Sequence, residues 1–190
     1  DNVKLEIGSA SGGDLQIYHD GSHSFINDAG TGDLHILTNF FRVNNAADDE
    51  AMIHADDDDG VDLFFNGVKK FETTAVGVTV TGTIIATTDT DTSNTGNVTL
   101  DFAANQNFVL TLTGNTTLVN PSTEQVGQSG FIAFIQDGTG GRTITLGTDY
   151  ETAGGAGITL TTAASKTDLV PYVVVAANRI LLGTPQRNFS

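Results

Sequence analysis

The most conspicuous chemical feature of the sequence is a run of four carboxylates before Gly60: Asp56, Asp57, Asp58 and Asp59. Clustered carboxylate oxygens are ligands that Ca²⁺ prefers, so this run is a candidate calcium site. When Gly60 is aligned with the invariant glycine of an EF-hand loop, the first ligand position falls on Ala55 and the twelfth on Asn66. The template therefore fails at both ends. The alternative is a solvated turn between two short strands.

The four histidines suggest a second metal hypothesis. In a homotrimer, one histidine from each chain can converge on the symmetry axis and bind a transition metal. His35 and His54 are the better candidates because both sit inside apolar, strand-like segments. The alternative is that these histidines simply occupy strand faces and turns.

Catalytic motifs are scarce. Gly127-Gln128-Ser129-Gly130 is one residue short of a nucleophile elbow, and the absence of cysteine excludes a thiol nucleophile. The glycine-rich stretch 138–142 lacks the elements of a dinucleotide or phosphate loop and is typical of a hairpin turn. Asp137, Asp149 and Glu151 offer carboxylates, but their spacing does not indicate a glycosidase pair. We expect a protein that is not an enzyme.

Sugar binding depends on exposed aromatic rings, and the chain has no tryptophan and three tyrosines. Tyr150, beside Glu151 in a glycine-rich loop, is the candidate aromatic for stacking on a glycan. Asn115 and the threonines that follow it are the second candidate group. An ordinary surface loop is the alternative interpretation of both segments.

The composition limits the possible partners. Eight basic and 23 acidic residues give a net charge of −15, which repels nucleic-acid phosphates and anionic membranes. No segment approaches the roughly 18 apolar residues of a membrane span, so we expect no membrane insertion. The single methionine is Met52, and we therefore expect a processed product or part of a longer protein.

The sequence predicts an all-β fold. Its 28 threonines favour strands, and no window shows helical periodicity. Only two of these threonines precede residue 73, whereas all the histidines do, which indicates two domains. We expect a repetitive β-hairpin shaft over 1–86, a Thr/Asp-rich linker over 87–96, and a β-sandwich or jelly-roll head over 97–190.

The shaft carries a loose repeat. The pattern Gly-Asp-Leu-x-Ile begins at Gly13 and Gly32 and returns in part from Val61 to Phe65. Turn residues, such as Asn66-Gly67, follow the copies and predict hairpins. Strands this short cannot close a core within one chain, so we expect residues 1–86 to be stable mainly in an oligomer. The uncharged strand over 76–85 should then be buried between chains.

In the head, turn signals separate about eight apolar segments, typical of a sandwich. The segment 172–175 is apolar on both faces and predicts a central strand. The expected strands are 98–102, 107–113, 116–119, 130–136, 142–146, 157–162, 169–176 and 179–182.

Several of these segments are similar to tail-fibre and appendage proteins of marine bacteriophages. The resemblance is carried by segments 14–21, 69–74 and 77–82 and, in the carboxyl-terminal part, by 111–115, 130–137 and 169–172. It implies a virion fibre, usually a homotrimer, used in host attachment. Its motifs are strand and turn signatures, so no family binding residue is carried over.

We therefore expect a structural subunit of a phage tail fibre or similar appendage, located in the virion and extracellular. Its partners would be other copies of itself, other virion or tail proteins, and a glycan or protein receptor on the host surface. We expect no cofactor other than the calcium considered above. The alternatives are a bacterial surface adhesin or secreted filament subunit, and a polysaccharide-degrading tailspike enzyme.

Overall fold

The chain is described by a computed structural model covering residues 4–8 and 13–190. Within these residues the regular structure is almost entirely strand, with one short 3-10 turn and no α-helix. The chain divides into two compact units, residues 1–83 and 84–190. The all-β fold expected from the threonine-rich composition is confirmed.

The N-terminal unit contains two antiparallel sheets. A three-stranded sheet has the order β1-β2-β3 and a five-stranded sheet the order β4-β5-β6-β7-β8. Their strands are β1 (Lys4–Ile7), β2 (Leu15–His19), β3 (Ser24–Asp28), β4 (Phe40–Asn44), β5 (Ala51–Asp56), β6 (Val61–Phe65), β7 (Val68–Thr74) and β8 (Gly77–Val80).

The predicted hairpins of this unit form where the turn residues allow them. Asn66 and Gly67 both have positive φ angles, 53° and 69°, and join β6 to β7 by a two-residue turn. The turn between β2 and β3 is held by the Asp20 carboxylate, which accepts hydrogen bonds from the backbone N–H groups of Ser22 and His23. The second copy of the repeat differs from the expectation, because residues 33–38 form no strand.

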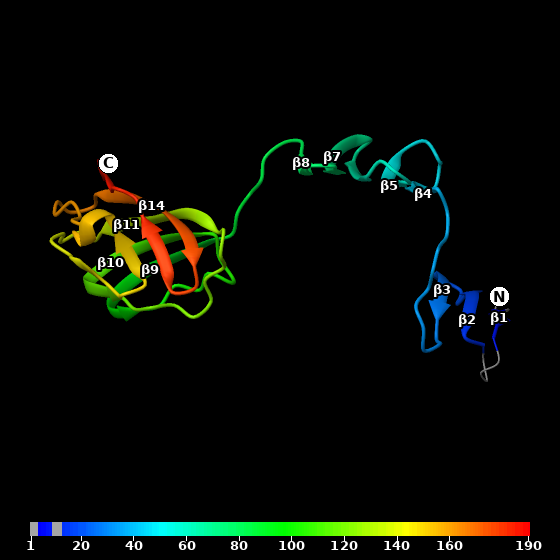
Figure 1. Ribbon diagram of the computed structural model, residues 1–190, viewed down its shortest axis with the longest axis horizontal. Coiled ribbons are helices and arrows are strands. Elements are labelled where there is room, and N and C mark those ends of the chain that lie inside the picture. Colours follow the sequence, from blue (N-terminus) through cyan, green and yellow to red (C-terminus); the bar gives the residue numbers. More distant parts are fainter. Residues whose placement is uncertain (1–3, 9–12) are drawn as a thin grey trace. The chain divides into compact units, whose positions relative to one another are not determined.

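The C-terminal unit is built on one eight-stranded sheet with the path β12-β10-β11-β14-β15-β13. Figure 1 labels β9, β10, β11 and β14 of this sheet. Strand β9 pairs with β10, and β16 pairs with β14. The strands are β9 (Thr88–Val98), β10 (Asn107–Leu118), β11 (Ser129–Gln136), β12 (Ile144–Leu146), β13 (Tyr150–Thr152), β14 (Thr167–Ala176), β15 (Arg179–Leu182) and β16 (Gln186–Phe189).

Several predicted strands are present and others are not. β11, β14 and β15 match the expected segments, and β14 is central, lying between β11 and β15. The segments expected as two strands at 107–113 and 116–119 are one strand, β10, whose pairing with β9 is irregular between Leu110 and Thr116.

The segments 98–102 and 157–162 were wrongly predicted as strands. Beyond Val98 they are irregular, although Leu100, Phe102 and Leu160 are buried in the core. Their apolar residues follow the core-facing pattern of a strand, but they lie in connections that cover the core instead of in the sheet. An alternation of apolar and polar residues indicates that one side of a segment is buried. A buried segment need not be hydrogen-bonded to a neighbouring strand.

The segment 87–96 was expected to be a linker, and nearly all of it lies in strand β9. β9 runs parallel to β10 with the register Thr88 to Asn107 at one end and Val98 to Leu118 at the other. Threonine suits a strand, and the exposed Thr and Asp side chains are suited to an edge. The polar composition of residues 87–96, which suggested a linker, is therefore explained by the position of β9 at an edge.

Strands β9, β10 and β11 are mutually parallel, which short hairpin loops cannot achieve. The connections 99–106 and 119–128 make the crossovers without a helix. Leu100 and Phe102, on the first connection, are 1% and 2% exposed and cover the core as a crossover helix would. The unit is thus a sandwich-like arrangement closed partly by irregular chain.

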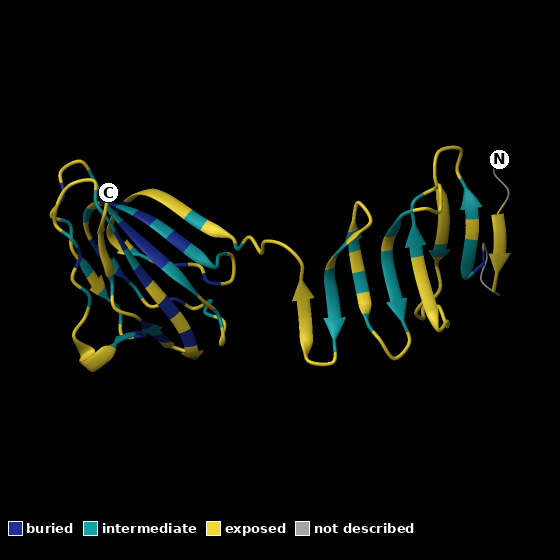
Figure 2. Cartoon of the chain, turned by 90° about the horizontal axis from the view of Figure 1, so that it is seen from above, coloured by how far each residue is buried: buried dark blue, intermediate teal, exposed yellow. Residues whose placement is uncertain are grey.

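All the buried hydrophobic side chains of the described residues belong to the C-terminal unit (Figure 2). Three aromatic rings, Phe102, Phe108 and Tyr172, pack with centroids 5.0 to 6.4 Å apart. The remaining members are aliphatic apart from Phe134 and Tyr150: Leu100, Leu110, Leu112, Leu118, Ile132, Ala133, Leu160, Val170, Val174, Ile180 and Leu182.

Candidate functional site

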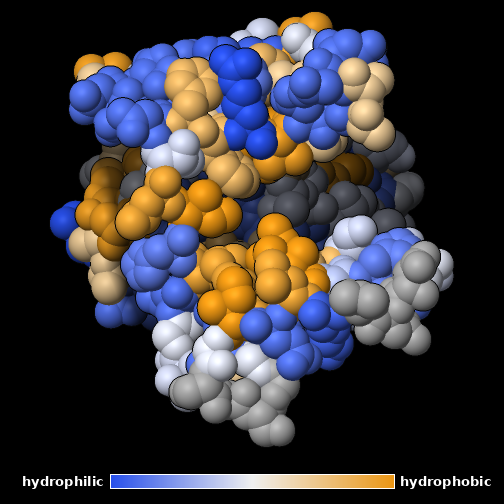
Figure 3. Space-filling model, turned by 90° about the vertical axis from the view of Figure 1, so that its right-hand side faces the viewer, coloured by the Kyte–Doolittle hydropathy of each residue, from blue (hydrophilic) through white to orange (hydrophobic). Residues whose placement is uncertain are grey.

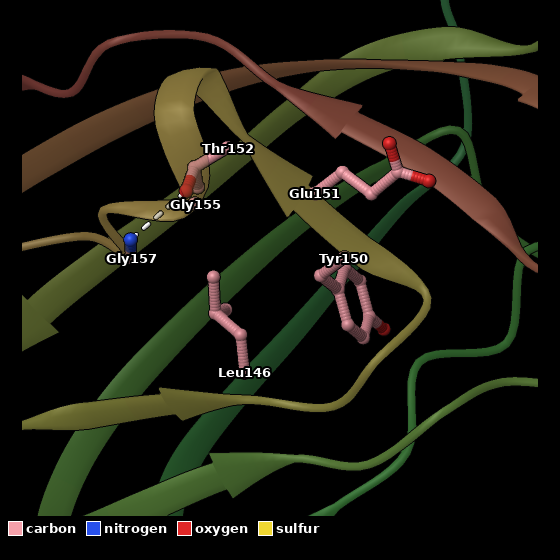
Figure 4. A pocket seen from close by; sticks show the side chains of 6 residues that line it. All are labelled: Leu146, Tyr150, Glu151, Thr152, Gly155 and Gly157. Atoms are coloured by element: carbon pink, nitrogen blue, oxygen red, sulfur yellow. Dashed lines mark hydrogen bonds between the residues drawn. The ribbon is translucent and has the colours of Figure 1, made fainter.

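A pocket of about 350 Å³ lies in the C-terminal unit beside β13. Its lining includes two of the residues predicted to bind a ligand, Tyr150 and Glu151, and both come from this short strand (Figure 4). The other lining residues are Leu146 of β12, Thr152, Gly155 and Gly157. The Thr152 hydroxyl accepts a hydrogen bond from the Gly157 backbone N–H at 2.9 Å, which closes the loop on one side of the pocket.

Tyr150 does not present its ring to solvent. The residue is only 5% exposed and belongs to the hydrophobic core, so its expected role as an exposed stacking platform was wrong. Burial, followed by the nearby carboxylate of Asp149, raises the pKa of the Tyr150 phenol well above its usual range. The buried phenol oxygen has no hydrogen-bond partner among the described residues.

Glu151 points away from Tyr150 in Figure 4 and is engaged elsewhere. Its two carboxylate oxygens accept hydrogen bonds from Nε and Nη2 of Arg179 at 2.6 and 2.9 Å. This bidentate contact lowers the pKa of Glu151 and raises that of Arg179. The contact ties β13 to its parallel neighbour β15.

Asn115 lies within β10 and does not line this pocket. Its side-chain oxygen accepts a hydrogen bond from the Thr143 backbone N–H at 3.1 Å, next to the pairing of β10 with β12. The three predicted ligand residues therefore make internal contacts, and the structure does not bring Asn115 together with the other two in one cavity. Ligand binding by this group stays a prediction.

Two of the carboxylates weighed for sugar cleavage, Asp137 and Glu151, have lowered pKa values. Asp137 accepts hydrogen bonds from Arg142 and from the backbone N–H groups of Thr139 and Gly140, and these contacts lower its pKa. The pKa of Glu151 is likewise lowered, by its hydrogen bonds with Arg179. A glycosidase general acid needs the opposite, a raised carboxyl pKa. Neither residue is suited to that role.

The four predicted calcium ligands lie where β5 ends and turns into β6, as the alternative interpretation predicted: Asp56, Asp57, Asp58 and Asp59. The Asp56 backbone N–H donates to the Gly60 carbonyl at 3.0 Å, and Asp58 has a positive φ angle of 64°. The Asp57 backbone N–H donates to the Asn39 carbonyl at 2.9 Å, which ties the turn to the start of β4.

These contacts come from the backbone, and they do not gather the four carboxylates around one point. Within residues 4–8 and 13–190 of a single chain, no three His, Cys, Asp or Glu side chains are placed to hold a metal ion. Calcium binding at this turn is left as a prediction.

The two histidines considered for an axial metal site lie in different settings. His54 is in β5 and packs against the rings of Phe40 and Phe64, with centroids 6.4 and 4.9 Å away. His35 lies in the irregular segment between β3 and β4. A metal shared between chains remains a prediction for either residue.

A buried carboxylate that the sequence interpretation missed organises the C-terminal end. Asp168 is 2% exposed and accepts hydrogen bonds from the Thr161 backbone N–H and hydroxyl and from the Asn188 backbone N–H. It thereby fixes the irregular segment at Thr161 and strand β16 against β14. Its place in the sequence, between Thr167 and Leu169, gives no signal of this role, because partners distant in sequence create it.

The chain was compared with protein families, curated proteins and solved structures. Residues 86–176 match a family model described as "Putative phage tail fibre C-terminal domain". No curated protein and no solved structure matches the chain. In the part of the chain that the structure describes, no helix has the length and apolarity required to cross a membrane.

The matched residues run from just before β9 to the end of β14, and so include most of the sandwich-like unit. The resemblance to phage tail fibres, seen in the strand and turn segments of the sequence, is confirmed for this unit. The association with virion or tail proteins follows from it at the level of the family. Over residues 86–176, the C-terminal unit of this chain is similar to the C-terminal domain of phage tail fibres.

Proposed function

We propose that this protein is a structural subunit of a phage tail fibre that assembles with copies of itself, as a trimer, and serves in host attachment. The observation that carries the proposal is the contrast between the two units. Among the described residues of the N-terminal unit, 4–8 and 13–83, no hydrophobic side chain is buried. Figure 3, which faces this unit, shows apolar side chains in orange at the surface.

Exposure of this kind is costly in water. Monomeric soluble proteins rarely expose large contiguous apolar areas, and two- or three-stranded sheets need a covered face to be stable. Fibres solve both problems by packing identical chains around one axis. The well-formed hairpins of this unit supply the shape, and neighbouring copies would supply the core.

The repeat gives independent support. The Gly-Asp-Leu-x-Ile pattern forms β2, and its partial copy forms β6, each the partner of two neighbouring strands. The second copy, residues 33–38, has no strand partner within the described chain, and Leu37 is 91% exposed. A segment with strand-forming sequence and free backbone groups is suited to pair with another chain.

Attachment would then rest on avidity. Several copies of a weak site on one oligomer bind a host glycan or protein receptor more tightly than any single site does. This mechanism requires no catalysis at the pocket beside β13. It agrees with the lowered pKa values of Asp137 and Glu151, whose carboxylates are both paired with an arginine.

The decisive experiment is the solution mass of the chain by light scattering, with and without EDTA. We expect three times the 19.8 kDa chain mass at micromolar concentration. A folded monomer would overturn the proposal. A mass that falls on chelation would support metal binding by the Asp56–Asp59 turn or the histidines, whereas an unchanged mass would count against a metal that holds the oligomer together.

A further inference from the structure

The five-stranded sheet of the N-terminal unit carries apolar and polar residues in alternate rows that cross every strand. In one row, Val43 pairs with Ile53, Ile53 with Leu63, Leu63 with Phe71, and Phe71 with Val80. Residues paired across an antiparallel sheet project from the same face. This row therefore places five apolar side chains side by side, one from each of β4 to β8.

The adjacent row lies on the opposite face and is polar throughout. Arg42 pairs with His54, His54 with Asp62, Asp62 with Glu72, and Glu72 with Thr79. Because each of these residues is the sequence neighbour of an apolar-row residue, its side chain points the other way. The two rows of the sheet thus differ sharply in chemistry.

Two carboxylates of the polar face are paired with one ammonium within a single chain. The Lys69 ammonium lies 2.7 Å from the Asp62 carboxylate and 2.9 Å from that of Glu72. The hydrogen bonds that the ammonium donates to the Asp62 and Glu72 carboxylates raise the pKa of Lys69. Two aromatic rings beside this row already pack against His54 within the chain. A face whose Asp62 and Glu72 carboxylates are already paired, and whose Arg42 guanidinium lies over the Phe40 ring, gains little from a partner and is suited to water.

The opposite face extends the apolar row over the whole sheet. Its members, here called the apolar face, are Phe41, Val43, Ile53, Val61, Leu63, Phe65, Val68, Phe71, Val78 and Val80. Phe65 is 74% exposed, Val78 62% and Val68 51%. None of these members is charged. Burying their side chains therefore does not carry the free-energy cost of removing an ion from water.

We propose that the apolar face is the surface through which copies of this chain pack together, with the Arg42-to-Thr79 face turned to solvent. The inference deepens the homo-oligomer proposed above and rests on it. The occupant is a second copy, and charge favours this face for the contact: each chain carries −15, so two copies repel wherever carboxylates meet. Only an uncharged surface allows close approach, and a rotation axis brings the same face of each copy together.

Adjacent residues of β8 give a matched test. Val78 belongs to the apolar face, Thr79 to the polar face, and both are exposed in a single chain. The chain has no cysteine, so Val78→Cys and Thr79→Cys each create a single reporter in the full chain. We expect maleimide to label the Val78→Cys oligomer about tenfold or more slowly than the Thr79→Cys oligomer, because labelling must await opening of the interface.

A second pair of variants tests the energetics. Val78→Lys places a charge inside the proposed interface and should lower the mass seen by light scattering toward that of one chain. Thr79→Lys makes the same charge change opposite Glu72 and should leave the mass unchanged.

The possible outcomes distinguish a failure of the proposed interface from a failure of the proposed homo-oligomer. An oligomer in which Val78→Cys is labelled as fast as Thr79→Cys would overturn the assigned face while leaving the oligomer intact. Preserved mass in Val78→Lys would do the same. A monomeric wild-type chain, with both cysteines freely labelled, would overturn both proposals, and the surface would then belong to a different tail protein.

Discussion

Two tyrosines of the C-terminal unit differ in the surroundings of their hydroxyl oxygen. Tyr150 and Tyr172 are both almost completely buried, at 5% and 4% exposure. The Tyr172 hydroxyl donates a hydrogen bond to the Gln106 carbonyl at 2.6 Å, whereas the Tyr150 phenol oxygen has no partner among the described residues. Burying an unpaired hydroxyl costs free energy that a paired one recovers.

Replacement by phenylalanine should therefore act in opposite directions at these two positions. Tyr150→Phe is expected to leave the free energy of unfolding unchanged or raise it by about 1 kcal/mol, since it removes an unpaired buried hydroxyl. Tyr172→Phe, the matched control, should lower it by about 1–2 kcal/mol because the Gln106 carbonyl loses its donor. Urea denaturation of both variants measures the difference. Equal destabilisation would mean that the Tyr150 hydroxyl has a partner in solution.

Strand β9 shows how a polar segment is fixed in place by one side chain. Asn94 is 1% exposed, and its Nδ2 donates hydrogen bonds to the carbonyls of Asp91 and Thr111, each at 3.1 Å. These bonds lie where the pairing of β9 with β10 changes register. The side chain thus satisfies backbone groups that the ladder leaves open at an irregularity.

We expect Asn94→Ala to destabilise the C-terminal unit by about 1–3 kcal/mol, because two partly buried carbonyls lose a donor. Asn97→Ala, in the same strand but exposed, should change the stability by less than about 0.5 kcal/mol. Thermal or urea denaturation of the two variants is the measurement. If both variants behaved alike, β9 would be held by its backbone ladder alone.

At the scale of the whole molecule, the two units should differ in what holds them folded. The C-terminal unit contains the entire buried hydrophobic set of the described residues, whereas the N-terminal unit depends on neighbouring copies in our proposal. Intramolecular cores give concentration-independent unfolding. Assembly-dependent stability rises with protein concentration.

A fragment of residues 84–190 is therefore expected to be a folded monomer with one cooperative, concentration-independent transition. The full chain should show a further transition whose midpoint rises with concentration as the oligomer is favoured by mass action. Light scattering of the fragment, with circular dichroism melts of both proteins at two concentrations, measures this. A fragment that itself forms the full-length oligomer would place the assembly contacts in the C-terminal unit.

The sequence by itself determined the fold class, the paired turns and the central strand of the C-terminal unit. Threonine content, the Asn66-Gly67 turn and the apolar run 172–175 depend on local conformational preference and on burial, which the residue types express directly. The same patterns carried the resemblance to phage tail fibres, which the family match at residues 86–176 confirmed.

Only the tertiary structure decided which apolar segments enter the sheet and which side chains are free. Leu100 and Leu160 obey the burial pattern of strands but lie in irregular connections, and Tyr150 is buried in a loop-like sequence that predicted exposure. Glu151 meets Arg179 only because β13 and β15 are parallel neighbours. Ladder pairing and ion pairing join residues distant in the chain, so their outcome depends on register and packing, which no local pattern encodes.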